Sequence, residues 1–81
     1  MRWKRVRYAW IVKMIVKMAK SLGDDEEVEL RKIVEFFEDI EGVSIDRVRL
    51  VGMLEKKGVV RCVKEMRGDV LKETLMMVRP A

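Results

Sequence analysis

The chain has 81 residues, of which 49% are hydrophobic and 40% are charged, and its formal net charge at pH 7 is +4. This length is sufficient for one small domain, but not for a deep substrate cavity beside its core. Histidine is absent and cysteine occurs once, so catalytic Ser/His/Asp and Cys/His arrangements and the usual zinc ligands are all missing. We therefore expect a protein that is not an enzyme and that holds no metal and no cofactor.

The first predicted helix covers residues 8–22 and follows a basic arm, residues 1–7. Ile11, Ile15 and Met18 recur at steps of three and four, and three lysines share the opposite edge. The apolar arc is wider than one small core can cover. We therefore expect a homodimer through this helix and the C-terminal segment, with interface residues Ile11, Ile15, Met18, Met76 and Met77.

A second helix is predicted over residues 25–40. Gly23 suits the end of the first helix, and the run Asp24-Asp25-Glu26-Glu27 supplies a cap and negative charge for the start of the next one. We expect an inner face formed by Leu30, Ile33, Val34, Phe37 and Ile40. The outer face is acidic and is a candidate docking surface for a protein partner.

The third predicted helix covers residues 45–57, with Ser44 as its N-cap and Gly58 after its end. The expected inner face consists of Val48, Leu50, Val51 and Leu54, and the outer face of Arg49, Gly52, Met53 and Lys56. Gly52 suits either close approach of an external partner or tight packing on a neighbouring helix.

The spacing of the hydrophobic residues changes after Gly58. Residues 59–64 are β-branched and partly alternating, Arg67-Gly68-Asp69 is a turn signal, and residues 75–78 are apolar, which predicts a hairpin. A short helix over residues 70–78, capped by Asp69, fits the same apolar spacing. Periodicity alone does not separate these two alternatives.

Three helices followed by a hairpin, with Leu54-Glu55-Lys56-Lys57-Gly58-Val59-Val60 at the junction, resemble the winged helix-turn-helix superfamily. The resemblance implies an α+β fold that is mainly α with a small β-hairpin. It implies one domain over residues 1–81, with the arm at 1–7, three helices within 8–57 and a wing hairpin at 58–79. Within it, residues 45–57 would be the recognition helix and residues 66–69 the wing tip.

The same resemblance implies a dimeric transcriptional regulator that reads double-stranded DNA with the recognition helix and the wing. The expected DNA-binding residues are Arg47, Arg49, Lys56, Arg61, Lys64 and Arg67. Two departures weigh against specific readout. The acidic first turn of the second helix would repel phosphate, and the recognition helix lacks the Asn, Gln, Ser and Thr that supplement arginine at base edges. The alternative is a winged-helix module that binds protein and not DNA.

The composition also bears on the source and the cellular compartment of the protein. Asn and Gln are absent while charged residues are abundant, which is typical of proteins from hyperthermophiles or of a designed chain. A single cysteine fits a reducing cytoplasm. Lysines interrupt the apolar run of residues 8–22, so we do not expect this segment to span a membrane. Binding to a membrane surface is disfavoured because the lysine-rich stripe is narrow. We expect a cytoplasmic protein of archaeal or viral type.

Overall fold

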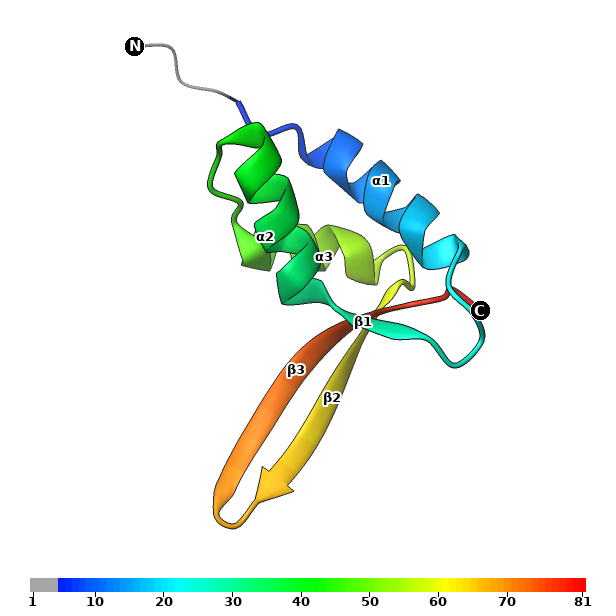
Figure 1. Ribbon diagram of the computed structural model, residues 1–81, viewed down its shortest axis with the longest axis vertical. Helices are drawn as coiled ribbons and strands as arrows, with labels where there is room; N and C mark the ends of the chain where they lie inside the picture. The colour runs from blue at the N-terminus through cyan, green and yellow to red at the C-terminus, as the bar shows by residue number, and fades with distance from the viewer. Residues whose placement is uncertain (1–4) are drawn as a thin grey trace.

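A computed structural model describes residues 5–81, which form three helices and one three-stranded antiparallel sheet. The helices gather at one end, and a long hairpin projects from them at the other (Figure 1). The elements in chain order are α1 (Tyr8–Lys20), β1 (Glu27–Glu29), α2 (Leu30–Glu41), α3 (Arg47–Glu55), β2 (Val60–Arg67) and β3 (Val70–Val78). The predicted α+β class and the predicted hairpin are both confirmed.

The core lies where the helices meet the base of the sheet. Each helix contributes the apolar positions of one stripe, and the sheet adds Val59, which directly precedes β2, and Met77 from β3. The helical members of the core are Ile11, Val12, Ile15 and Ala19 of α1, Leu30, Val34 and Phe37 of α2, and Leu50 and Leu54 of α3. Burial of these side chains is the main force that holds the three helices together.

The start of α2 differs from the prediction. Residues 27–29 form β1, which pairs antiparallel with β3 so that Val28 lies opposite Met77, and α2 begins only at Leu30. A three-residue strand is fixed by this tertiary pairing and leaves almost no periodic signal in the sequence. The acidic run Asp24–Glu27 therefore lies outside the first turn of α2, which contains no acidic residue.

The N-cap of α3 and the exposure of two apolar residues also differ from the prediction. The N-cap of α3 is Asp46 and not Ser44, because the Asp46 carboxylate accepts the backbone N–H groups of Val48 and Arg49 at 3.0 and 3.2 Å. Val48 and Ile40, both predicted to face inward, are 85% and 60% exposed. Their helices pack through neighbouring apolar positions, which the sequence pattern did not distinguish from these two.

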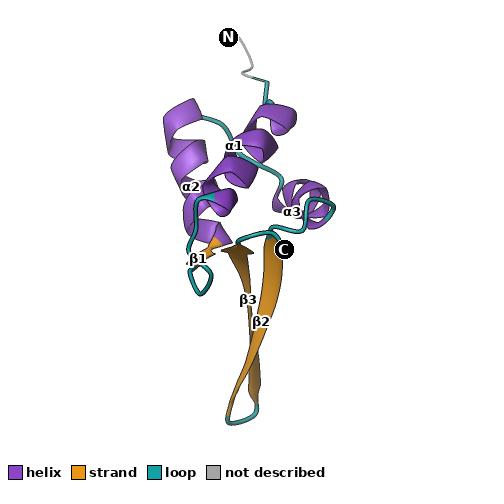
Figure 2. Ribbon diagram, turned by 90° about the vertical axis from the view of Figure 1, so that its right-hand side faces the viewer, coloured by secondary structure: helices purple, strands orange, loops and turns teal. Residues whose placement is uncertain are grey.

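The hairpin joins β2 to β3 through Gly68 and Asp69 and excludes the alternative helix over 70–78. Gly68 has a φ of +61°, which glycine adopts without steric cost at the first central position of a tight hairpin turn. The sheet order is β1-β3-β2, so β3 is the central strand. The outer half of the hairpin extends past the helices, as Figure 2 shows, and exposes Met66, Val70 and Leu71.

Candidate functional site

The N-terminal end of α3 is held in place by α1. The hydroxyl of Tyr8 accepts the backbone N–H of Asp46 at 3.0 Å, and Asp46 in turn caps α3. The Arg49 guanidinium stacks on the Tyr8 ring, 4.2 Å from its centroid. Stacking uses the face of the guanidinium and leaves its in-plane N–H donors available to a ligand. The first residue of α1 thus positions both the cap and an arginine of α3.

The connection from α2 to α3 is fixed by Glu38. One carboxylate oxygen accepts the backbone N–H of Ile45 at 2.8 Å, and the other accepts a guanidinium N–H of Arg47 at 3.2 Å. Gly42 ends α2 with a φ of +63°, and its N–H donates to the Glu38 carbonyl at 2.8 Å. These bonds set the angle between the two helices, so Glu38 has a structural function that the sequence did not reveal.

The exposed face of α3 is centred on Gly52. A Cβ atom added there would meet no atom within 4 Å, so the glycine is not needed for packing inside the chain. Val48 and Glu55 lie on one side of it and Arg49 and Lys56 on the other, as the helical period requires. This face is therefore accessible to a partner, with cations along one border only.

A groove bordered by four lysines lies between α1 and the C-terminal end of α3. Its volume is about 630 Å³, and its apolar floor includes Val12, Val16 and Met53. None of the four lysines forms an ion pair with any residue in the described range 5–81. They are Lys13, Lys17 and Lys20 of α1 and Lys57 after α3. We call this feature the lysine groove.

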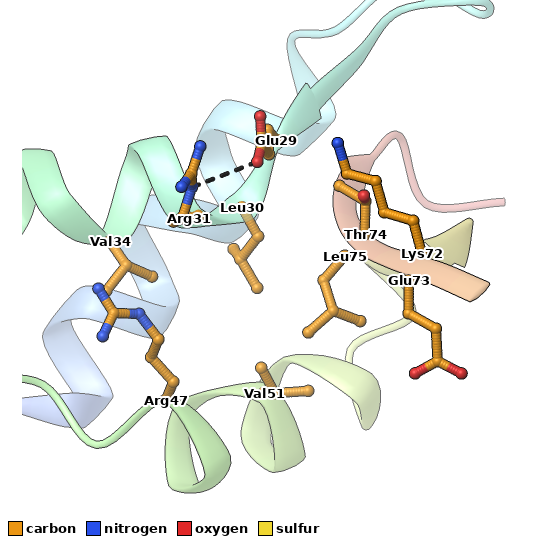
Figure 3. A pocket seen from close by; sticks show the side chains of 10 residues that line it. All are labelled: Glu29, Leu30, Arg31, Val34, Arg47, Val51, Lys72, Glu73, Thr74 and Leu75. Atoms are coloured by element: carbon orange, nitrogen blue, oxygen red, sulfur yellow. Dashed lines mark ion pairs between the residues drawn. The ribbon is translucent and has the colours of Figure 1, made fainter. Parts of the chain in front are cut away.

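A second groove, of about 400 Å³, separates α2 and α3 from β3 (Figure 3). Its apolar lining consists of Leu30, Val34, Val51 and Leu75. Its charged rim has both signs, from Glu29, Arg31, Arg47, Lys72 and Glu73, and Arg31 pairs with Glu29 at 3.3 Å. The rim thus combines three cations with two carboxylates, whereas the charged residues of the lysine groove are all cations.

The three hairpin cations predicted to bind DNA do not share one face. The register places Arg61 and Arg67 on one face of the sheet and Lys64 on the other, because successive strand residues alternate. Arg61 pairs with Glu27 of β1, and Lys64 lies 3.9 Å from Glu73. Arg67, at the end of β2, has no ion pair among residues 5–81.

The structure therefore separates the six predicted DNA-binding residues into groups. Arg47, Arg61 and Lys64 are near carboxylates, Arg49 is stacked on Tyr8, and Lys56 and Arg67 have no ionic partner in the described part of the chain. All six remain exposed. Sequence reasoning did not connect Lys57 with the lysines of α1, because only the fold brings them together.

The residues predicted to form a dimer interface need correction. Ile11, Ile15 and Met77 are 2%, 0% and 1% exposed within one chain, so they belong to its own core and cannot contact a second copy. Met18 and Met76 are half-buried. Ile11 and Ile15 of α1 therefore belong to the core of the monomer, and α3 packs against this helix.

Within residues 5–81, no group of three or more potential ligands among Cys, Asp and Glu is placed to hold a metal ion. None of the helices in that range has both the length and the apolar composition needed to cross a bilayer. Comparison of the chain with protein-family models, with curated proteins and with solved structures gave no match.

Proposed function

We propose that the protein is a winged-helix protein that binds duplex DNA through the exposed face of α3. The element order, with a three-stranded sheet in the order β1-β3-β2 and a hairpin after the third helix, is compatible with that fold. The observation that carries the proposal is the lysine groove. It borders α3 with four cations that have no ionic partner among the described residues.

Phosphate binding requires cations that are free to replace counterions, and the lysine groove meets this requirement. Lys13, Lys17 and Lys20 follow one edge of α1 at steps of four and three residues, and Lys56 and Lys57 continue the basic surface at the end of α3. The acidic run that would oppose phosphate lies outside the first turn of α2. The run keeps its negative charge, but two of its carboxylates, those of Asp24 and Glu27, pair with Arg79 and Arg61.

The hairpin suits a second contact on the other side of α3. Strands rise about 3.3 Å per residue, so the eight residues of β2 place Arg67 roughly 25 Å from the base of the sheet. With α3 in a major groove about 12 Å wide, a hairpin of this length reaches the adjacent groove or phosphate strand. Arg67, like Lys72 of β3, forms no ion pair with any residue in the range 5–81.

Base recognition by α3 would be limited. The centre of its exposed face has Val48, Gly52 and Glu55, which offer an apolar contact to a thymine methyl group, close backbone approach and one acceptor. Arg49, held on Tyr8, is the residue best placed to donate to a guanine edge. We therefore expect binding dominated by phosphate contacts, with a modest sequence preference.

Fluorescence anisotropy with a labelled random duplex tests the proposal. The wild-type protein should bind with a Kd on the order of micromolar at about 50 mM salt and much more weakly at about 200 mM. Lys17→Ala, Lys56→Ala and Arg67→Ala should each flatten the slope of log K against log salt by about one unit. Arg31→Ala on α2 is the matched control, because it removes one positive charge from another surface, where the guanidinium is already paired with Glu29. No binding at low salt, or equal effects of all four variants, would refute the proposal.

A second candidate is a protein-binding module without DNA contact. The specific observation in its favour is Val48, which is 85% exposed and lines, with Val51, Gly52 and Leu75, an open hollow between α3 and β3. Apolar side chains at the centre of a surface are typical anchors for protein partners. If random duplex fails to bind at low salt, Val48→Glu should abolish capture of a protein partner, whereas Lys17→Ala should not.

A further inference from the structure

The outer side of α2 carries an apolar row that no element within residues 5–81 covers. Phe36 and Ile40, one helical turn apart, are 55% and 60% exposed, and half-buried Ile33 continues the row. Trp10, 37% exposed, borders it through an edge-to-face contact with Phe37, whose ring also meets Phe36. Large apolar side chains grouped in this way on a small protein mark an interaction surface. We call this row, with Trp10, the α2 patch.

Two charges of opposite sign flank the α2 patch. Lys32 and Asp39 are both exposed, and neither has an ion pair with any residue from 5 to 81. They are seven residues apart, so they lie about two turns apart along the same side of the helix. Phe36 lies between them. The sequence of α2 is therefore self-complementary about Phe36: a cation precedes it by one turn, and an anion follows it by one turn.

We propose that the α2 patch binds the same patch of a second copy, with the two α2 helices antiparallel and the two-fold axis passing near Phe36. Residues one turn before Phe36 then lie opposite residues one turn after it. Phe36 meets its own counterpart, Ile33 meets Ile40, and Lys32 meets Asp39, and every contact except the central one occurs twice. Antiparallel packing also sets the two helix dipoles in opposition.

Charge complementarity favours a second copy over an unrelated apolar partner. In this register, Lys32 of each copy meets Asp39 of the other. The contact leaves the proposed DNA surface open. Glu38, which bonds the connection to α3, projects from the side of α2 opposite to Phe36 and Ile40. The proposal is therefore independent of DNA binding, and it replaces the dimer through α1 that the sequence suggested.

Sedimentation velocity at high micromolar concentration tests the interface. The wild-type chain should sediment at twice the 9.6 kDa monomer mass. Phe36→Glu should raise the dimer dissociation constant at least about 100-fold, because the new charge is buried against its own copy. Leu71→Glu on the hairpin, where the wild-type leucine is 51% exposed, is the matched control and should remain dimeric. Circular dichroism confirms that each variant is folded, and Phe36→Ala provides a milder second variant.

Charge reversal tests the register itself. Lys32→Glu and Asp39→Lys should each weaken self-association, because each leaves like charges facing across the interface. An equimolar mixture of the two variants regenerates both pairs and should associate several-fold to about 10-fold more tightly than either alone. A monomeric wild-type chain, a Phe36→Glu variant that associates like wild type, or a mixture no tighter than its components would overturn the proposal.

Discussion

Replacing Asp46 tests the view that one side chain organises the N-terminus of α3. In Asp46→Ala the N–H groups of Val48 and Arg49 lose the carboxylate that now lies 3.0 and 3.2 Å away. Removal of such a cap costs about 0.5–2 kcal/mol of the free energy of unfolding. The helix has only nine residues, so its own propensity contributes little to compensate. A loss of about 1 kcal/mol, near the middle of this range, lowers the Tm of a domain of this size by roughly 4–8 °C.

Thermal unfolding followed by circular dichroism measures this shift, and Asp46→Asn is the control. Asparagine caps helices about as well as aspartate, so Asp46→Asn should retain most of the stability that Asp46→Ala loses. Tyr8→Phe removes the acceptor of the Asp46 N–H and should cost about 0.5–1.5 kcal/mol, towards the low end because the bond is exposed. If Asp46→Ala melts at the wild-type temperature, or Asp46→Asn is destabilised equally, the capping argument is wrong.

Four further outcomes are expected from thermal or urea unfolding. Gly52→Ala should stabilise the protein by up to about 1 kcal/mol, because the site is helical, exposed and open. Gly68→Ala should destabilise it by about 1–2 kcal/mol, because alanine is strained at a φ of +61°; equal effects of the two glycine changes would contradict this reasoning. Leu54→Ala should cost about 2–5 kcal/mol, since Leu54 is fully buried, and a smaller loss would mean that the core collapses around it. Glu27→Gln should cost at most about 1 kcal/mol, because its pair with Arg61 is largely exposed, and a larger loss would show that β1 depends on it.

The elements that could be predicted from the sequence are those set by local pattern. The stripe of α1 and the turn at Gly68-Asp69 follow from residue spacing and glycine chemistry, and the structure confirms both. β1 could not be predicted in the same way. Its single apolar residue, Val28, lies in a strand only because β1 pairs with β3, which is distant in the sequence.

The candidate site could be predicted only in part, for a related reason. A sequence shows that a residue is basic, but not whether a carboxylate from another element will approach it. Glu38 and Glu27 reach Arg47 and Arg61 across the fold, so the charge of these arginines is partly neutralised in a way that spacing does not reveal. The lysine groove is the opposite case, because folding adds Lys57 to a row that the sequence already showed on α1.

The central position of β3 has a consequence for the order in which the sheet is assembled during synthesis. β1 and β2 pair with β3 and not with each other, and β3 follows both of them in the chain. While the ribosome is still adding residues 70–78, β1 and β2 have no partner strand, although the residues of all three helices have already been synthesised. The sheet therefore cannot be completed before its last strand has been synthesised. A nascent chain stalled before Val70 would carry unpaired strand edges, the kind of surface that chaperones recognise and that promotes aggregation.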